Sequence, residues 1–134
     1  MTVQRFLLDT SIAIEVLRGR RPDLRERFNA HVDELATSSV VVSELLYGVH
    51  RSTTPERLKR QVDWLIQLVT VLDFDEPAAA HAAEIRADLA VLGTPIGAYD
   101  ILIAGYARSR GLVVVTQNGK HFARVPGLRH TDWR

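Results

Sequence analysis

Short runs suited to buried strands alternate with helix-period segments along the whole chain, and this alternation restricts the fold more than any other feature. The candidate strands are residues 6–8, 35–38, 70–74 and 112–116. Between them, apolar side chains recur at the spacing of one helix face. Such alternation predicts a mostly parallel central sheet with helices on both faces, joined by right-handed crossovers. We therefore predict an α/β fold.

The size and composition of the chain fit one domain of this kind. Of its 134 residues, 46% are hydrophobic, which is enough for one sizeable core. We expect a single domain over residues 1–134. Because 17 Lys and Arg oppose 16 Asp and Glu, the formal charge is only +1, and any attraction to nucleic acid must come from local clusters.

The absence of some sequence features excludes several classes of protein. The chain has no cysteine, which excludes disulfides, zinc thiolate sites and thiol nucleophiles. No signal-peptide pattern follows Met1, and no apolar run approaches membrane-spanning length. We expect a cytoplasmic protein that makes no membrane contact.

An acid ends the first apolar run, in the stretch FLLDTSI. Asp9 would lie at the carboxyl end of the first strand, which is the edge at which open α/β sheets bind ligands. The same position suits a helix N-cap, and Asp9, Thr10 and Ser11 are all residue types that cap helices. On this motif alone, both interpretations stay open.

Two further acids stand in apolar helical segments. Residues 42–49 carry apolar side chains at helical spacing, which places Glu44 on a helix. Asp100 lies near the start of the helix in IGAYDILIAGYA, where a solvated face would carry several charges. Each acid alone could be an exposed helix residue or could interact with the amino end of its helix. Three acids in apolar surroundings favour a shared site.

If Asp9, Glu44 and Asp100 meet at one edge of the sheet, their charges require a cation. Two carboxylates about 4 Å apart repel by roughly 4 kcal/mol at an effective dielectric of about 20. Oxygen ligands without His or Cys suit Mg2+ or Mn2+. When one or two carboxylates bind Mg2+, the ion keeps several of its waters. The pattern predicts metal-assisted hydrolysis of a phosphodiester.

Four segments carry a resemblance to a known family. In order, they are FLLDTSIAIEVLRG, SSVVVSELLYGVH, IRADLAVLGTPIGAYDILIAGYA and LVVVTQNGKHF. They resemble the successive motifs of PIN-domain ribonucleases, and most closely those of the VapC toxins of bacterial toxin-antitoxin pairs. The resemblance implies a PIN-like fold and a magnesium-dependent endoribonuclease that cleaves structured RNA, above all transfer RNA. It also implies that Asp9, Glu44 and Asp100 are the catalytic, metal-binding acids.

The chain departs from the family pattern in two places. Many PIN domains have a fourth acid after the last central strand, where this chain has Asn118. We expect Asn118 to orient a metal-bound water, and the choice between one and two metal ions stays open. The first motif often reads DTN and reads DTS here, with Ser11 able to donate as Asn does. We expect Thr10, Ser11 and Thr116 to support Asp9 or to contact a substrate phosphate, unless they act as caps or strand-end hydroxyls.

The resemblance also implies partners. VapC-like toxins form homodimers and are inhibited by a VapB-type antitoxin, and they contact DNA only indirectly, through that antitoxin. The segment 55–69 has more apolar side chains than one buried stripe requires, which fits either a partner surface or deep burial. Several basic residues fit either phosphate contacts or a solvated surface; they are Arg18, Arg20, Arg21, Arg108, Arg110, Lys120, His121 and Arg124.

Two other classes of function compete with a nuclease. A receiver-type domain would use Asp73 or Asp75 as its phosphoacceptor, but it needs a second acid beside Asp9, where Thr10 and Ser11 stand. A catalytically silent PIN-like domain would serve only as an RNA-binding or assembly module. The retained acids argue against both alternatives.

Overall fold

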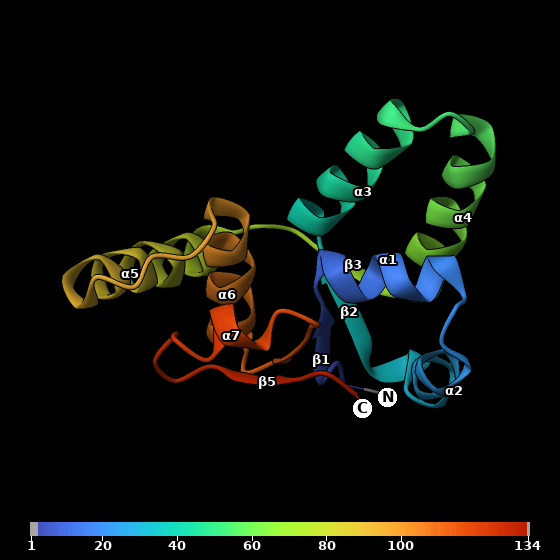
Figure 1. The fold of residues 1–134 in the computed structure, drawn as a ribbon. Helices are drawn as coiled ribbons and strands as arrows, with labels where there is room; N and C mark the ends of the chain where they lie inside the picture. The colour runs from blue at the N-terminus through green and yellow to red at the C-terminus, as the bar shows by residue number, and fades with distance from the viewer. Residues whose placement is uncertain (1–2, 134) are drawn as a thin grey trace.

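The computed structural model describes residues 3–133, and these form a five-stranded parallel sheet with helices around it (Figure 1). The strands are β1 (Phe6–Leu8), β2 (Leu35–Ser38), β3 (Thr70–Leu72), β4 (Val113–Val115) and β5 (Arg129–Thr131). They lie in the order β3-β2-β1-β4-β5, and each neighbouring pair is parallel. The prediction of an α/β fold with a mostly parallel sheet is confirmed.

Seven α-helices and one short 3-10 helix connect these strands within the described residues. They are α1 (Thr10–Arg18), α2 (Pro22–Ala30), η1 (Val32–Glu34), α3 (Ser39–Arg51), α4 (Pro55–Leu68), α5 (Glu76–Leu92), α6 (Ala98–Arg110) and α7 (Gly119–Phe122). Over residues 3–133, no helix has both the length and the apolar character that crossing a bilayer requires.

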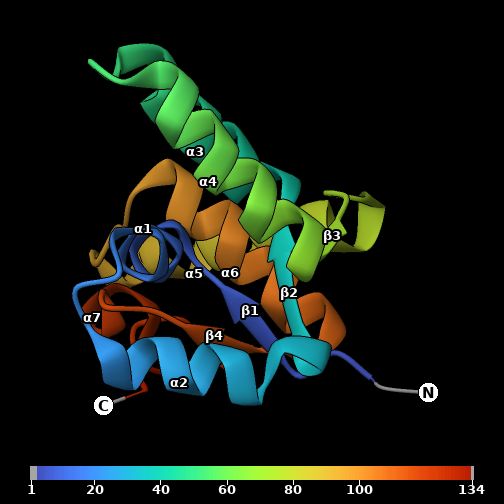
Figure 2. The ribbon, with the colours of Figure 1, turned by 90° about the vertical axis from the view of Figure 1, so that its right-hand side faces the viewer.

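Helices cover both faces of the sheet. In Figure 1, α5 and α6 lie on one side of the strands, and α1 and α2 lie on the other. Figure 2 shows the same arrangement after a quarter turn, with α1 and α2 in front of β1 and α6 behind it. The helices α3 and α4 form a pair that projects beyond the sheet (Figures 1 and 2). The strand order requires this arrangement, because the chain crosses from β3 to β4 through α5 and α6.

The central strands are apolar because both of their faces are covered. All residues of β1 and β2 are buried, and Val114 and Val115 of β4 are fully buried. The edge strand β5 differs, since Arg129 and His130 are exposed. The sequence predicts neither β5 nor α7, because a three-residue polar edge strand and a four-residue helix have no hydrophobic periodicity to detect.

The helices α5 and α6 are packed so closely at Gly105 that their backbones are in contact. A Cβ atom added at Gly105 of α6 would lie 2.7 Å from both the Cβ and the backbone nitrogen of Ala82, and 2.8 Å from the carbonyl oxygen of Ala78. Only glycine fits this contact. The contact matters for the site because α6 carries Asp100 in its first turn.

We predict that Gly105→Ala destabilises the protein by about 1–3 kcal/mol, because the new methyl group meets backbone atoms that cannot move aside. The loss should appear even though alanine favours helices more than glycine does. The matched control is Gly48→Ala in α3, where an added Cβ meets no atom within 4 Å. It should stabilise by up to about 1 kcal/mol in urea unfolding. Equal stability of the two variants would disprove the close contact.

Candidate active site

The carboxyl ends of the central strands gather polar residues at one edge of the sheet. Leu8 of β1 pairs with Val115 of β4, so the residues that follow them, Asp9 and Thr116, lie side by side. The neighbouring strand β2 ends in Ser38, whose side chain caps α3. Two helices therefore begin at the same edge, α1 after Asp9 and α3 after Ser38.

Asp9 is the N-cap of α1, as one of the two sequence interpretations predicted. Its Oδ1 accepts hydrogen bonds from the backbone N–H of Ile12 at 3.0 Å and from the Ser11 hydroxyl at 2.8 Å. Its Oδ2 accepts a hydrogen bond from the hydroxyl of Thr116. The residue is only 2% exposed. Capping does not exclude a functional role, because the same bonds fix the carboxylate at the ligand-binding edge of the sheet.

The other two acids reach this edge from α3 and α6. Glu44 is partly buried on α3, and its Oε1 accepts a hydrogen bond of 2.7 Å from the Thr10 hydroxyl, at the start of α1. Asp100 lies in the first turn of α6, and its Oδ2 accepts a hydrogen bond of 2.9 Å from Nδ1 of His121. Each acid is thus held by a side chain from another helix.

Burial and the charges of neighbouring acids raise the pKa of two carboxylates, Asp9 and Glu44. Burial raises the pKa of Asp9, hydrogen bonds from Thr116, Ile12 and Ser11 oppose the rise, and the charge of Asp100 adds to it. Burial also raises the pKa of Glu44, and the charges of Asp100 and Asp9 raise it further. The acids therefore repel one another across this edge.

The donor set fits a hard divalent cation. Among the described residues, Oδ1 of Asp100 and Oε2 of Glu44 accept no hydrogen bond, so both oxygens are available to a cation. Within residues 3–133, no three His, Asp or Glu side chains form a ready chelating group. Mg2+ is usually held by one or two carboxylates and several waters, so a site for it would need only one or two of these acids.

The three hydroxyl residues predicted to contact either acids or substrate all contact acids. Ser11 and Thr116 donate to Asp9, and Thr10 donates to Glu44. The hydroxyl of Ser11 also accepts a hydrogen bond of 3.1 Å from the backbone of residue 117. Substrate contacts by these hydroxyls stay a prediction.

The last motif contains Asn118, for which the sequence predicted a role, and His121, whose contact with an acid the sequence did not predict. Asn118 is exposed, and within the described chain its side chain makes no hydrogen bond, while its backbone N–H donates to Thr116 at 2.8 Å. Its predicted role in orienting water stays untested. His121, one helical turn later, contacts Asp100 instead. The sequence placed His121 among basic residues that fit either phosphate contacts or a solvated surface, and the i, i+3 spacing from Asn118 was the only local signal for a role beside the acids.

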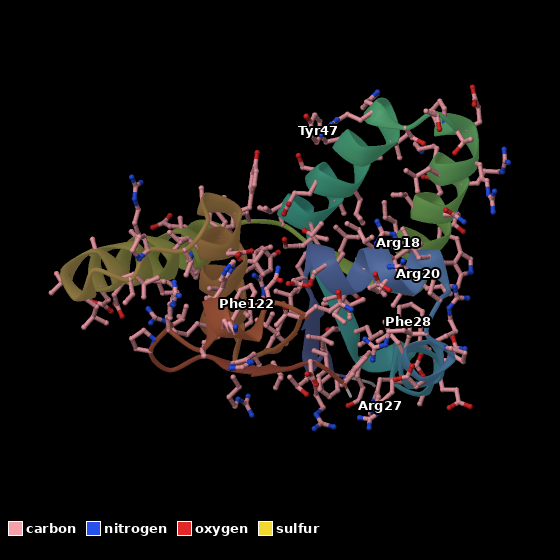
Figure 3. All side chains as sticks on the ribbon, in the orientation of Figure 1. Arg18, Arg20, Arg27, Phe28, Tyr47 and Phe122 are labelled. Atoms are coloured by element: carbon pink, nitrogen blue, oxygen red, sulfur yellow. The ribbon has the colours of Figure 1, made fainter. Side chains whose placement is uncertain are left out.

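The basic loop after α1 is largely ion-paired. Arg18 and Arg20 lie 3.2 and 2.6 Å from the Glu15 carboxylate, and Arg21 lies 3.1 Å from that of Asp23. Figure 3 shows Arg18 and Arg20 at the end of α1. The prediction that these arginines contact phosphates gains no support from this pairing.

Two other basic residues for which phosphate contacts were considered, Arg108 and Arg110, also form ion pairs. Arg108 pairs with Glu84 at 2.8 Å and donates to Nδ1 of His81 at 3.0 Å, so it joins α6 to α5. Arg110 pairs with Asp75 at 2.8 Å, and the Asp75 side chain also caps α5. Asp75 therefore has a structural role that a receiver-type phosphoacceptor would not have.

Comparisons with known proteins agree with this architecture. The model of the PIN domain family matches residues 6–128. A tRNA(fMet)-specific endonuclease VapC from Salmonella typhimurium is 46% identical over 129 residues, which cover 96% of this chain and 98% of that protein. Ribonuclease VapC2 from Haemophilus influenzae is 39% identical, with the same coverage of both chains.

Solved structures show the same fold. A chain in the crystal structure of DNA-bound VapBC from Salmonella typhimurium superposes with a TM-score of 0.94 at 46% identity, covering 98% of this chain and 99% of that one. A chain of VapBC2 from Rickettsia felis, bound to a DNA fragment from its promoter, has a TM-score of 0.91 at 28% identity. That match covers 100% of both chains.

The raised pKa values of Asp9 and Glu44 predict the pH response of the cation-free protein. A carboxyl with a higher pKa in the folded chain stabilises the fold below its unfolded pKa, and this contribution is lost as the pH rises through the folded pKa. The loss therefore occurs above the ordinary values of 3.8 for Asp9 and 4.5 for Glu44. Since Asp100→Asn removes one cause of both shifts, the variant should gain stability relative to the wild type between about pH 4 and 7.

Urea unfolding in EDTA across this pH range measures the effect. Carbon-13 NMR titration should show a lower pKa for both Asp9 and Glu44 in the variant. The control is Asp88→Asn, which neutralises an acid on α5 and should change neither value. An unchanged pH dependence in Asp100→Asn would show that the acids do not interact.

Proposed function

The chain belongs to the PIN domain family and, within it, to the VapC ribonucleases, and from that membership we propose that it is a magnesium-dependent endoribonuclease toxin of a type II toxin-antitoxin pair. The observation that carries the proposal is the placement of three acids around the carboxyl edge of the sheet, with Asp9 bonded to Thr116, Glu44 to Thr10 and Asp100 to His121. We take residues 1–134 to act as one PIN-like domain, and we place the protein in the cytoplasm, where its RNA substrate is found.

Transfer RNA is the proposed substrate class. Two relatives, from Salmonella typhimurium and Shigella flexneri, are named tRNA(fMet)-specific endonucleases and are 46% and 45% identical to this chain. Their similarity extends over 96% of this chain, so it includes all the motifs around the acids. We therefore propose tRNA(fMet) as the first substrate to test.

The proposed mechanism assigns a different task to each acid. Mg2+, or Mn2+, when bound, would neutralise charge that develops on the scissile phosphate and lower the pKa of a bound water. Asp9 fixes the position of the site through its three hydrogen bonds, and its Oδ2, which accepts only one of them, can also bind the cation. Asp100 and Glu44 each offer one free oxygen to the cation. Because its pKa is raised, Glu44 is also suited to accept a proton from the attacking water.

A VapB-type antitoxin is the proposed partner, because similar chains were solved as VapBC complexes. An apolar hollow of about 250 Å³ lies beside Glu44 and is lined by Leu17, Leu45 and Leu58 among others. We propose that the antitoxin covers this hollow. DNA would then be contacted only through the antitoxin.

Some of the extra apolar side chains of α4 are buried and others are exposed. Val62 and Leu65 are buried in the core, while Trp64 and Leu68 stay 37% and 41% exposed. Deep burial thus explains some of its apolar residues but not all of them.

A homodimer is proposed through the opposite side of the protein. A hollow of about 590 Å³ between α5 and α6 has mainly apolar walls, which include Phe74, Ile96 and Ile101. Nearby in the chain, Leu92 and Tyr99 are 63% and 56% exposed. An apolar surface of this kind is typical of a subunit contact.

We predict that the purified protein cleaves tRNA(fMet), that EDTA stops the cleavage and that Mg2+ restores it. Asp9→Asn, Glu44→Gln and Asp100→Asn should each lower the rate by more than about 100-fold. Thr10→Val, which removes only the hydrogen bond to Glu44, should lower it by about tenfold. Gel analysis of end-labelled RNA measures the rates, and Asp88→Asn is the control. Full activity of folded Asp100→Asn would refute the site.

We also predict that expression from the native locus yields a complex with a smaller polypeptide. Leu58→Glu should abolish capture of that polypeptide, because it places a charge in the hollow beside Glu44. Leu92→Glu should leave capture intact and disrupt the homodimer instead. Affinity capture and light scattering measure the two effects. If Leu92→Glu abolishes capture and Leu58→Glu disrupts the homodimer, the antitoxin and dimer surfaces have been assigned to the wrong sides.

A further inference from the structure

A polar cleft lies between α1, α2 and α4, next to the hollow that Glu44 lines. Its volume is about 280 Å³, and its walls are Leu17, Arg25, Arg57, Arg60, Gln61 and Trp64. Half of these residues are arginines, and none is an acid. The cleft therefore has the charge and the donors of an anion site.

Arg25 is oriented in the wall of the cleft before any ligand binds. Its Nη2 donates a hydrogen bond of 2.8 Å to the carbonyl of Val16, and its guanidinium lies 4.9 Å above the centre of the Trp64 ring. Trp64 is itself held against Phe28, with the ring centres 5.8 Å apart. A guanidinium held in this way loses little conformational entropy when it binds an anion.

Arg57 and Arg60 supply positive charge to the cleft, and no acid lines its walls. They lie three residues apart on the exposed face of α4, so their side chains are neighbours. Within the described residues, neither forms an ion pair or a hydrogen bond, whereas Arg18 and Arg20 share Glu15. Arg57 and Arg60 are therefore free to bind an anion, whereas the arginines of the basic loop are paired.

The cleft is adjacent to the hollow that Glu44 lines. Leu17 and Gln61 line both the cleft and the hollow that contains Glu44. Arg57 also lines a third hollow together with Arg18, which borders the Glu44 hollow as well. Figure 3 places Arg18 at the end of α1, between α4 and α2. A chain-like ligand that extends from the cleft into the neighbouring hollow would touch both the arginines and Glu44.

We propose that this arginine cleft binds a backbone phosphate of the RNA substrate, away from the bond that is cut. The proposal rests on the ribonuclease function proposed above. Guanidinium groups pair with phosphate through two parallel hydrogen bonds, and three of them around one cleft suit a phosphate better than a single carboxylate. Because the cleft lies next to the Glu44 hollow, its ligand should be a polymer. One RNA chain can place the bond to be cut at the acids and another of its phosphates in the cleft. Arg25, Arg57 and Arg60 are then residues for substrate binding.

The test uses the Asp100→Asn protein, which we expect to bind RNA without cutting it. Fluorescence anisotropy with labelled tRNA(fMet) gives the dissociation constant over a series of salt concentrations. Adding Arg57→Ala and Arg60→Ala should raise the dissociation constant about tenfold near physiological salt and lower the salt slope by about 1. Arg57→Lys with Arg60→Lys should keep most of the slope, because the charge remains. Since both residues are exposed on α4, thermal unfolding should not change.

The matched control is Arg86→Ala, which removes an exposed arginine from α5, on the opposite side of the sheet. It should leave the affinity for tRNA(fMet) unchanged. The cleft proposal is overturned if the Arg57→Ala, Arg60→Ala protein binds RNA as tightly as its parent, even if it binds an acidic peptide less well. It is also overturned if Arg86→Ala weakens binding equally. If the Asp100→Asn parent itself fails to bind tRNA(fMet), the proposed substrate is wrong, which is a separate failure.

Discussion

The buried carboxylate of Asp9 is the constraint on which the rest of the site depends. An ionised carboxylate that is almost fully buried is stable only when hydrogen bonds replace its lost water. Asp9 obtains them from Ile12 and Ser11 at the start of α1 and from Thr116 after β4. One side chain thus joins the first strand, the first helix and the fourth strand. The direction of α1, and with it Thr10, follows from this bond pattern.

The other two acids are held less tightly than Asp9, and this difference is consistent with their proposed tasks. Glu44 and Asp100 each keep one carboxylate oxygen without a hydrogen bond among the described residues. Burial, and to a smaller extent repulsion between the acids, raises the pKa of Asp9 and Glu44, so ionising these carboxyls is unfavourable when no cation is present. A divalent cation would offset this cost and gain its ligands in the same step.

Local sequence patterns predict the strands β1 to β4 and the helices that carry Asp9, Glu44 and Asp100, because buried strands and amphipathic helices have their own periodicities. They also lead to the family, since its motifs surround those acids. The sequence did not predict β5 or the contact of His121 with Asp100, because the edge strand is polar and the contact joins residues 21 positions apart. Nor could it show which arginines are neutralised, since ion pairing depends on the packed structure.

The separation between the acids and the uncommitted arginines has a physical reason. An arginine placed beside a free carboxylate would pair with it, as Arg18 and Arg20 do with Glu15, and both groups would be lost to other ligands. Surface charges are screened over about 8 Å at physiological ionic strength, so arginines that make no contact with the acids can stay positive without neutralising them. An RNA molecule is repelled by the acids and attracted by Arg57 and Arg60. Attraction at a distance from the acids therefore allows a polyanion to approach a site that must itself remain negative to hold a cation.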